Sequence, residues 1–571
     1  MFQFVKSAKW RLGEQTAFET LGELHDERGT GGAIEWHKMG SGWSWSRKEG
    51  SDEDHAADAL AGWREIQRRL AAEQHGLYVL DEFTYPINWG WIDIDEVVET
   101  LTSRTGHQHV MITGRRADPE LIAVADLVTE MTKIKHPMDA GQKARRASNG
   151  RGRSVVAIPR LVIAAPASGH GKTTVATGLM AALRRSGHTV SGHKIGPDYI
   201  DPGYHALATD RPGRNLDPHL VGDDLVAPLF LHGAAGADIA VVEGVMGLYD
   251  GMLGTDGYAS TAHVAGLLGA PVILVVDISH ASRSIAAVVH GMASYDRTVR
   301  IAGVILNKAG SPRHSDEVIA ALESTGIPVL GVLQRDDGIS APSRHLGLVP
   351  AQERVEAAGQ LDRLASQIAE HIDLAEIVRI AQSAHPLPDM PWTPPGSGVE
   401  GPVIAVAGGR AFTFRYTETE EILRAAGCRT VTFDPLRDET LPADTAGIYL
   451  GGGFPEVHAA DISANVPLRE HLRAAIAGGV PTVAECAGLL YLCRDVDGAD
   501  MVGALDVSAR MTSRLTLGYR TAIAPADGLL GPAGTRVTGH EFHRTTVEAG
   551  PAPAWLLNGR PDGFATATLH A

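Results

Sequence analysis

Residues 161–174 read LVIAAPASGHGKTT, and this stretch decides the fold of the region that follows it. An apolar run typical of a buried strand leads directly into a turn that contains Gly169, Gly171, Lys172 and Thr173. In such a strand-to-helix turn, backbone N–H groups converge on a polyphosphate, the lysine adds a positive charge and the threonine hydroxyl binds Mg²⁺. The sequence therefore predicts an ATP and Mg²⁺ site at the edge of a parallel β-sheet.

The sequence on either side of this loop supports and qualifies the prediction. Residues 173–187, TTVATGLMAALRRSG, have helical periodicity, so a helix N-terminus beside Thr174 would add its dipole to the same anion site. Pro166, however, stands where the usual phosphate-loop pattern has its first glycine. The alternative is a glycine-rich strand-to-helix turn that binds no ligand.

Length, charge and cysteine content restrict the class of protein. A chain of 571 residues is too long for a single hydrophobic core, and its length favours about three or four domains. The net charge of -17 argues against a nucleic-acid or anionic-membrane partner, so an anionic ligand would need a local basic site. The 3 cysteines lack C-x-x-C spacing, and no signal peptide or transmembrane run is present. We therefore expect a cytoplasmic protein.

Two segments rich in turn formers predict where the domains end. Residues 147–159 mix Arg, Gly and Ser, and residues 385–401 are rich in Pro and Gly, so both are expected to be linkers. They separate folded segments at 1–146, 160–384 and 402–571. Apolar runs alternating with helical patterns predict an α/β fold with parallel sheets in each segment.

Charged residues follow the predicted strands of the middle segment. Residues 190–218 carry Lys194, Asp198 and Asp201 among turn formers, and the strand at 239–251 presents Glu243 and Asp250. Mg²⁺ takes few protein carboxylates besides phosphate oxygens and water, so the following set would suffice: Thr173, Asp198 and Glu243. Each acid taken alone could instead be a turn former or a helix cap.

Two further apolar runs, at 271–277 and 301–308, extend the predicted parallel sheet. Asn307 and Lys308 end the second run, where related folds recognise the nucleotide base. We expect Asn307 to contribute to ATP binding, although a structural role is equally compatible with its position.

With these residues in hand, the blocks SGHGKTT, KIGPDYIDPGYH, RPGRNLDP and VVEGVMGLYDG resemble the a,c-diamide synthases, which amidate cobyrinic or hydrogenobyrinic acid in vitamin B12 assembly. The nucleotide domain of that family is similar to dethiobiotin synthetase. The resemblance implies that a substrate carboxylate attacks the γ-phosphate of ATP and that ammonia displaces the acyl phosphate. It places ATP and Mg²⁺ at Lys172, Thr173, Asp198 and Glu243, with Asp201 and Asp250 beside the phosphorylation or substrate region. Lys194 would be an electrostatic clamp on the transferring charge.

The last segment carries the elements of a cysteine nucleophile. In residues 447–456, GIYLGGGFPE, a strand ends in glycines whose N–H groups could face an oxyanion. In residues 480–492, VPTVAECAGLLYL, Cys486 falls between a strand and a helix, where a sharp turn exposes the sulfur and the helix N-terminus lowers its pKa. His540 and His543, in GHEFHRTT, are candidate bases.

This segment resembles the cobyrinate and cobyric-acid branch of triad-type glutamine amidotransferase domains. The resemblance implies that Cys486 attacks the glutamine side-chain amide and that His543 activates the sulfur. It also implies three oxyanion donors: Gly452, Gly453 and Ala487. Other triad amidotransferases have a Glu two residues after the histidine, where this chain has Thr545, so the third member stays open. The other two cysteines, Cys428 and Cys493, are expected to be buried.

The first segment has its own family resemblance. The blocks FVKS with WRLGE, VLDEF, TGRRADPELIAVADLVTEM and KHPMDAGQKA follow the order found in the ATP-dependent corrinoid adenosyltransferases. Asp81 and Glu82 stand where a Walker-B acid would hold Mg²⁺, although a solvated strand end is the alternative. The phosphate loop of that family should precede FVKS, where only Met1 stands. We therefore expect this segment to be weak or inactive alone, as a remnant or as a half whose start was assigned too late.

Together these features predict a glutamine-hydrolysing ligase that uses ATP to amidate the a and c carboxylates of a corrin macrocycle. One alternative is cobyric acid synthase-type amidation of other corrin carboxylates. Another is a partitioning-type ATPase, although such proteins carry a signature Lys where this chain has Ala167 and have no need for Cys486 with His543. A homodimer is the candidate assembly. The sequence leaves open the oligomeric state, the order of amidation and whether the substrate contains cobalt.

Overall fold

A computed structural model describes residues 2–4, 34–39, 52–130, 158–335, 343–344, 347–348, 357–396, 400–548, 550 and 552–571. The chain divides into two compact units, Met1–Ser154 and Val155–Ala571, and each is described by itself. The WRLGE and KHPMDAGQKA blocks and almost all of the predicted linker 147–159 lie outside the described residues.

The first unit contains a parallel sheet with the strand order β2-β1-β3-β4. The strands are β1 (Phe2–Gln3), β2 (His37–Lys38), β3 (Leu77–Asp81) and β4 (His109–Ile112). The helices are α2 (Asp52–Ala71), α3 (Thr84–Asn88), α4 (Ile94–Ser103) and α5 (Pro119–Val124). Buried aromatic side chains, among them Trp63, Tyr78 and Phe83, form the core of this unit.

The carboxyl ends of β3 and β4 lie side by side, as expected for neighbouring parallel strands. The Thr113 hydroxyl, just after β4, donates to Asp81 Oδ1 at 2.8 Å and accepts the backbone N–H of Glu82 at 3.0 Å. Asp81 and Glu82 therefore lie at one sheet edge with the end of the neighbouring strand, where open α/β sheets bind their ligands.

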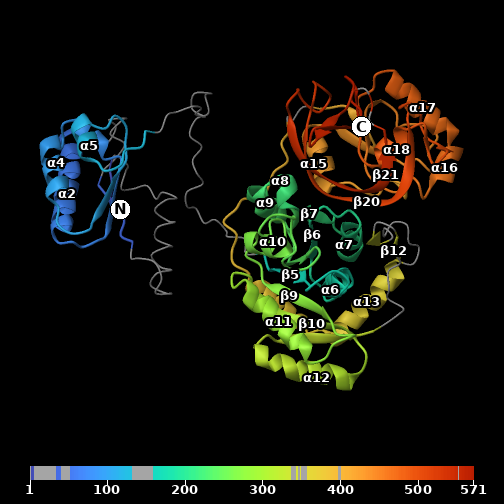
Figure 1. The fold of residues 1–571 in the computed structure, drawn as a ribbon, viewed down its shortest axis with the longest axis horizontal. Helices are drawn as coiled ribbons and strands as arrows, with labels where there is room; N and C mark the ends of the chain where they lie inside the picture. The colour runs from blue at the N-terminus through green and yellow to red at the C-terminus, as the bar shows by residue number, and fades with distance from the viewer. Residues whose placement is uncertain are drawn as a thin grey trace. The chain divides into compact units, whose positions relative to one another are not determined.

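The second unit begins with a parallel sheet of 7 strands in the order β11-β10-β9-β5-β8-β6-β7 (Figure 1). The strands are β5 (Arg160–Ala164), β6 (Val190–Ile195), β7 (Arg214–Leu216), β8 (Ile239–Glu243), β9 (Val272–Asp277), β10 (Ile301–Ala309) and β11 (Val329–Gln334). The helices are α6 (Lys172–Arg185), α7 (Asp201–Thr209), α8 (Pro218–Val221), α9 (Asp223–Gly233), α10 (Thr261–Leu267), α11 (Ser284–Tyr295), α12 (Pro312–Leu322), α13 (Ala357–His371) and α14 (Leu374–Gln382).

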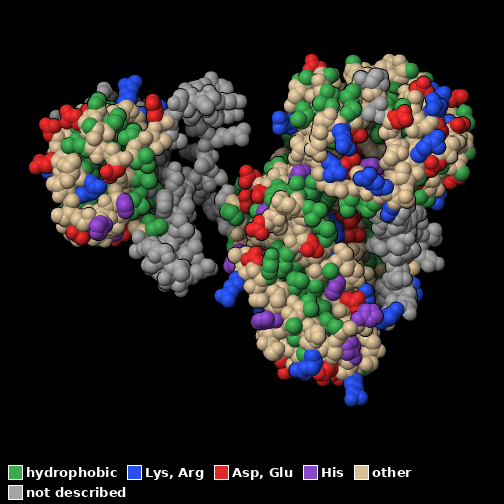
Figure 2. All heavy atoms as spheres, viewed as in Figure 1, with side chains coloured by type: hydrophobic (Ala, Val, Ile, Leu, Met, Phe, Trp, Pro, Cys, Tyr) green, Lys and Arg blue, Asp and Glu red, His purple; other side chains and the backbone are tan. Residues whose placement is uncertain are grey.

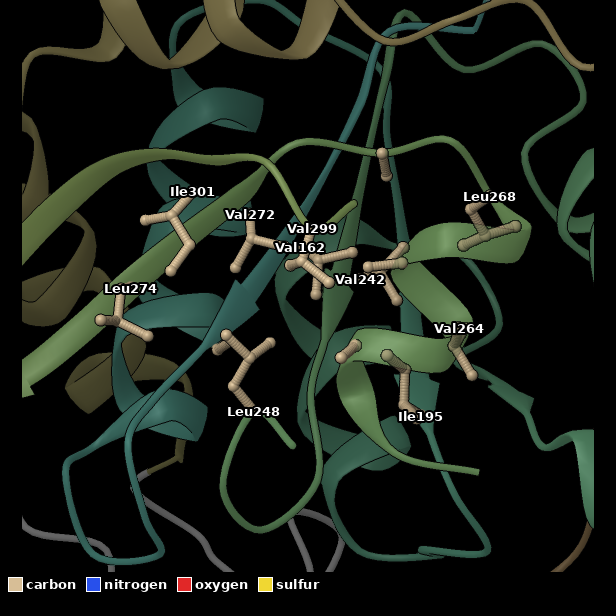
Figure 3. Packing of buried hydrophobic residues seen from close by; sticks show 14 of the residues in the cluster. Val162, Ile195, Val242, Leu248, Val264, Leu268, Val272, Leu274, Val299 and Ile301 are labelled. Carbon is tan, nitrogen blue, oxygen red and sulfur yellow. The ribbon is translucent and has the colours of Figure 1, made fainter. Parts of the chain in front are cut away.

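The central strands are apolar along their whole length because both faces of the sheet are covered. Alternate residues of β5 enter different cores: Val162 packs with α9 to α12 on one face, and Ile163 packs with α6, α13 and α14 on the other. Figure 3 shows the first of these cores, where Val162, Val242 and Val272 converge from neighbouring strands. Each fully buried aliphatic side chain contributes about 1.5–3 kcal/mol. The loop after β5 therefore follows a strand that is buried on both faces.

The C-terminal part contains a second parallel sheet with the order β15-β14-β16-β17-β24. The strands are β14 (Val403–Ala407), β15 (Arg429–Phe433), β16 (Thr445–Leu450), β17 (Thr482–Ala484) and β24 (Leu569–His570), and the helices are α15 (Thr417–Ala425), α16 (Ala459–Ala464), α17 (Val466–Ala477) and α18 (Ala487–Leu492). A separate sheet is built around the long antiparallel pair β20 (Ser508–Ile523) and β21 (Arg536–Val547). The predicted α/β class with parallel sheets is confirmed.

Charged and polar side chains join the seven-stranded sheet to the C-terminal part. Arg214, in β7, donates to Glu418 at 2.7 Å and to Glu421 at 2.5 Å, and all three side chains are largely buried. The Tyr519 hydroxyl in β20 donates to Asp217 Oδ2 at 2.9 Å. Since an ionic group that loses its partner in such a place stays desolvated, these contacts fix how the two parts of the unit meet.

We predict that Arg214→Ala destabilises the second unit by about 2–5 kcal/mol, because two glutamates then remain largely buried without their cation. Urea unfolding of the full chain would show this as a lower midpoint. The matched control is Arg184→Ala, which removes an exposed pair with Asp210 and should cost about 0–1 kcal/mol. Equal shifts for the two variants would contradict a structural role for the Arg214 contacts.

Candidate active sites

The predicted phosphate loop lies between β5 and α6. Gly169 and Gly171 have φ values of 87° and 93°, a left-handed conformation that favours glycine. Asn307, at the end of β10, donates from Nδ2 to the carbonyl of His170 at 2.9 Å, and a Cβ on Gly171 would lie 2.3 Å from that nitrogen. The loop therefore needs glycine at 171 for the approach of Asn307 as well as for its backbone conformation.

Lys172 is the first residue of α6 and its side chain is buried. Its Nζ donates to the carbonyl oxygens of Ala167 and Met246, which belong to the loop itself and to the loop after β8. Burial, together with the nearby Lys194, lowers the pKa of Lys172 to about 8. A phosphate in the loop would raise this pKa again, because an adjacent anion favours the protonated amine.

Beside the loop, a buried cluster joins Thr173 to one lysine and two acids. The Thr173 hydroxyl lies 2.5 Å from Glu243 Oε1 and 3.3 Å from Asp201 Oδ2. Lys194 Nζ lies between the acids, 2.7 Å from Asp201 Oδ2 and 3.0 Å from Glu243 Oε1. Hydroxyl and carboxylate oxygens are the ligands that Mg²⁺ prefers, so the residues present fit that ion.

The charges of this cluster depend on one another. Burial alone would lower the pKa of Lys194, but Asp201 and Glu243 raise it above the ordinary value. Burial raises the pKa of Glu243, while Lys194 and the hydrogen bond from His205 outweigh that effect and lower it overall. Burial and the neighbouring acids Asp198 and Glu243 raise the pKa of Asp201. Glu243 is therefore the carboxylate that stays ionised.

The structure separates the roles of the two aspartates that the sequence left side by side. Asp201, predicted for the phosphorylation or substrate region, is the one in contact with Thr173. Asp198, predicted as a Mg²⁺ ligand, instead accepts the backbone N–H groups of Ile200 at 2.7 Å and Asp201 at 3.0 Å, and so caps the start of α7. The described contacts therefore favour Asp201 over Asp198 beside the hydroxyl.

Three more predicted residues surround the loop. Asp250 accepts the backbone N–H of Gly247 at 2.9 Å and is close enough to Lys172 to affect its pKa. Thr174 lies in the first turn of α6. Asn307 has both ends of its amide engaged, with His170 and with the N–H of Lys308 at 2.9 Å, so it braces the loop instead of presenting a free amide to a base.

Sequence reasoning missed His205. Its Nε2 lies 2.7 Å from Glu243 Oε2, and both side chains are completely buried. Asp201 and His205 are four residues apart in α7 and so share a helix face, a spacing visible in the DPGYH block. No group of three His, Cys, Asp or Glu side chains arranged to hold a metal ion is found among the described residues.

The second site is the turn between β17 and α18, where Cys486 has φ 52° and ψ −106°. Such a strained backbone at a non-glycine residue is common where a nucleophile is presented. The side chain is exposed to solvent, yet the protein packed around its sulfur raises the thiol pKa to about 11. The N–H groups of Ala487 and Gly453 act in the opposite direction without prevailing. The expected lowering of the thiol pKa is thus wrong. The thiol therefore needs a base to remove its proton.

The oxyanion donors predicted around Cys486 differ in availability. The N–H groups of Gly453 and Ala487 lie against the sulfur. Gly452, in contrast, donates its N–H to the carbonyl of Phe414 at 2.9 Å and accepts the N–H of Phe414 at 3.0 Å. The geometry therefore favours Gly453 and Ala487 as the donors, with Gly452 holding their loop in place.

The two candidate bases differ in their surroundings. His543 Nδ1 donates to the carbonyl of Thr545 at 2.9 Å, and its Nε2 lies 3.4 Å from Glu541 Oε1. Burial lowers the pKa of His540 to about 4, and its ring stacks on Tyr199. No hydrogen bond joins Cys486 to either histidine within the residues that the structure describes. Glu541 is the carboxylate beside His543, so it is a candidate for the open third position.

Three further features are the burial of the other cysteines, the charge of the surface and the length of the helices. Cys493 is buried, as predicted, but Cys428 is only partly buried. Arg side chains gather over β20 and β21 (Figure 2), which carry Arg510, Arg514, Arg520, Arg536 and Arg544. None of the described helices has the length and apolar character needed to span a membrane.

Three family models match consecutive parts of the chain. Residues 1–148 match the ATP:corrinoid adenosyltransferase BtuR/CobO/CobP model. Residues 161–349 match the CobQ/CobB/MinD/ParA nucleotide binding domain, and residues 403–567 match the CobB/CobQ-like glutamine amidotransferase domain. Among solved structures, the chain aligns with the cell division ATPase MinD of Pyrococcus furiosus over 37% of its own length and 99% of that chain, at 19% identity and a TM-score of 0.22. This likeness is too slight to support a conclusion.

The chain aligns with several curated proteins over most of their length. The hydrogenobyrinate a,c-diamide synthase of Thermobifida fusca is 62% identical over 72% of this chain and 92% of that protein. The hydrogenobyrinate a,c-diamide synthase of Streptomyces coelicolor is 54% identical over 73% of this chain and 93% of that protein. The cobyrinate a,c-diamide synthase of a Synechococcus strain is 43% identical over 72% of this chain and 93% of that protein. The chain therefore belongs to the a,c-diamide synthase family.

Proposed function

We propose that this chain is an ATP- and glutamine-dependent ligase that converts the a and c carboxylates of hydrogenobyrinic or cobyrinic acid to amides. The observation that carries the proposal is the presence of two complementary sites in one compact unit. One has a phosphate loop with a Thr173, Asp201 and Glu243 cluster, and the other has a cysteine held in a strained turn beside free backbone amides. Carboxylate activation and ammonia release need these two sites together.

In the first half-reaction, the loop amides and Lys172 would bind the phosphates of ATP. Mg²⁺, held by Thr173 and the neighbouring carboxylates, would neutralise charge on the transferring phosphate. Lys194 keeps Asp201 and Glu243 in position, and His205 orients the second oxygen of Glu243. These contacts let the chain present one ionised carboxylate beside the Thr173 hydroxyl without a costly rearrangement.

In the second half-reaction, a base removes the proton of the Cys486 thiol, and the sulfur attacks the side-chain amide of glutamine. The N–H groups of Gly453 and Ala487 would stabilise the developing oxyanion. We assign the base to His543: its Nδ1 donates to the Thr545 carbonyl, so Nε2 is left to take the proton, and Glu541 beside Nε2 would stabilise the charged ring. Water then releases glutamate from the thioester, and the ammonia set free is the nitrogen source for the amide.

The substrate and its surroundings form the finer part of the proposal. Higher identity to the two hydrogenobyrinate-named relatives than to the cobyrinate-named one supports the cobalt-free macrocycle. The arginines of β20 and β21 would attract a polycarboxylate to a chain whose net charge is -17.

We propose domain boundaries at 146/160 and 384/402. A cytoplasmic location and a homodimeric assembly are also part of the proposal, the former because all 3 cysteines are free.

The direct test is incubation of the full chain with ATP, Mg²⁺ and glutamine plus either hydrogenobyrinic or cobyrinic acid, followed by mass analysis of the product. We expect two successive mass changes that each correspond to replacement of a hydroxyl by an amino group, with hydrogenobyrinic acid converted faster. Amidation at more than two side chains would favour a cobyric acid synthase-type activity instead.

We predict that Cys486→Ala abolishes amidation driven by glutamine and leaves amidation driven by ammonium salts unchanged, because only glutamine hydrolysis needs the thiol. Parallel assays with the two nitrogen sources measure this. Cys493→Ala is the matched control, since that thiol is buried in the core and should not affect the ratio of the two activities. Equal loss of both activities in Cys486→Ala would contradict the proposed division of labour.

We predict that Lys172→Met lowers amidation by about 10²–10³-fold with either nitrogen source, because the charge on the transferring phosphate loses a fixed cation. The same loss with ammonium salts separates this variant from Cys486→Ala. A variant that lost only glutamine-driven amidation would exclude Lys172 from the phosphate site.

A comparison of His543→Asn with His540→Asn tests the assignment of the base. We expect His543→Asn to lower glutamine hydrolysis by about 10²–10⁴-fold, the usual range for a general base. His540→Asn should retain most of it, because a pKa near 4 makes this ring a weak acceptor for the thiol proton. Release of glutamate is the measurement, and the reverse pattern would transfer the role of base to His540.

A further inference from the structure

Tyr199 connects the two candidate sites. It lies on the loop between Asp198 and Asp201, while its ring contacts side chains that belong to the C-terminal part of the unit. Ring centroids are 4.8 Å apart for Tyr416, 5.3 Å for Phe414 and 5.8 Å for His540. The planes of Tyr199 and Phe414 differ by only 15°, so these two rings are stacked.

The stack continues as a small apolar cluster of its own. Ile200, Tyr204, Phe414 and Phe454 are buried together, with Tyr199 packed against them. Ile200 and Tyr204 come from the start of α7. Phe414 pairs with Gly452, and Phe454 follows Gly453. This cluster is therefore built jointly by the two parts of the unit, and it lies apart from the cores of either sheet.

At one end, the contacts of Tyr199 reach the Cys486 turn. Phe414, on which Tyr199 stacks, forms a pair of backbone hydrogen bonds with Gly452, at 3.0 and 2.9 Å. Gly453, the next residue, supplies one of the two N–H groups beside the thiol. Burial, and then the neighbours Tyr416, Glu485 and Cys486, raise the pKa of Tyr199, which agrees with a hydroxyl close to the thiol.

At the other end, the backbone of Tyr199 is held by the phosphate site. Asp198 accepts the N–H groups of Ile200 and Asp201, which fixes the loop on both sides of the ring. Asp201 in turn contacts Lys194 and Thr173. One residue thus has its main chain anchored beside the Thr173 and Asp201 cluster and its side chain beside the Cys486 turn.

We infer that Tyr199 is a positioning residue that couples the two half-reactions, since its stacked ring excludes water from the path between the Cys486 turn and the Asp201 cluster. The inference rests on the proposed function. Glutamine and water give glutamate and one ammonia at the thiol. That ammonia forms the C–N bond at the acyl phosphate while the C–O bond to phosphate breaks, and the nitrogen then loses one proton. A ring that keeps water out retains the ammonia for this step.

The test compares Tyr199→Ala and Tyr199→Phe with the native full chain and with Tyr295→Ala as the matched control. Tyr295 ends α11, and its side chain is 76% exposed. The measurements are the number of glutamates formed per amide with glutamine, and the amidation rate with saturating ammonium chloride. In Tyr199→Ala we expect glutamate per amide to rise by about fivefold or more, while the ammonium-driven rate stays within about twofold of the native rate.

Tyr199→Phe keeps the ring and should keep the native ratio, as should Tyr295→Ala. If Tyr199→Ala fails to fold, Tyr199→Leu, which retains bulk but no ring, is measured by the same ratio. A native ratio in the ring-less variant, or an ammonium-driven rate that falls as far as the glutamine-driven rate, would overturn the inference. Absence of amidation by the native chain with both nitrogen sources would instead contradict the proposed function itself.

Discussion

The buried interaction of Lys194 with Asp201 and Glu243 is the constraint on which the nucleotide site depends. Two carboxylates beside the phosphate loop would repel each other and would lose several kcal/mol of hydration each, so they need a cation of their own. Lys194 supplies it from β6, and His205 adds a hydrogen bond to Glu243 from α7. The cluster thereby ties two strands and one helix to Thr173 and keeps at least one acid ionised where a metal ion would bind.

The rest of the second unit brings a separate chemistry to that cluster. Arg214 binds two glutamates of α15, and Tyr519 binds Asp217, so polar contacts hold the C-terminal part against the edge of the seven-stranded sheet. The aromatic cluster around Tyr199 and Phe414 joins the same two parts of the unit. A thiol that produces ammonia and a site that activates a carboxylate are useful to each other only if the ammonia is not lost to water. The structure of the junction is therefore part of the chemistry that we propose.

Most of the fold could be predicted because a parallel sheet buried on both faces needs continuous apolar strands. The runs at 161–165, 271–277 and 301–308 correspond to β5, β9 and β10, and the glycines of the predicted loop have a left-handed backbone. Side-chain partners were harder to predict. Asp198 and Asp201 are three residues apart and chemically alike, but only the start of α7 decides that one caps the helix while the other faces Thr173.

By itself, the sequence determined the α/β class and led to the proposals of a phosphate loop at Gly169 to Thr173 and of Cys486 as the nucleophile, because each depends on local residue order and on hydrophobic periodicity. Only the tertiary structure decided which backbone amides remain available to the thiol, since Gly452 is occupied by Phe414, a residue far away in the sequence. It also decided that the thiol pKa is raised, because the desolvation that outweighs the nearby amides comes from residues packed around the turn. The position of Tyr199 between the two sites likewise arises from the meeting of segments that are more than two hundred residues apart.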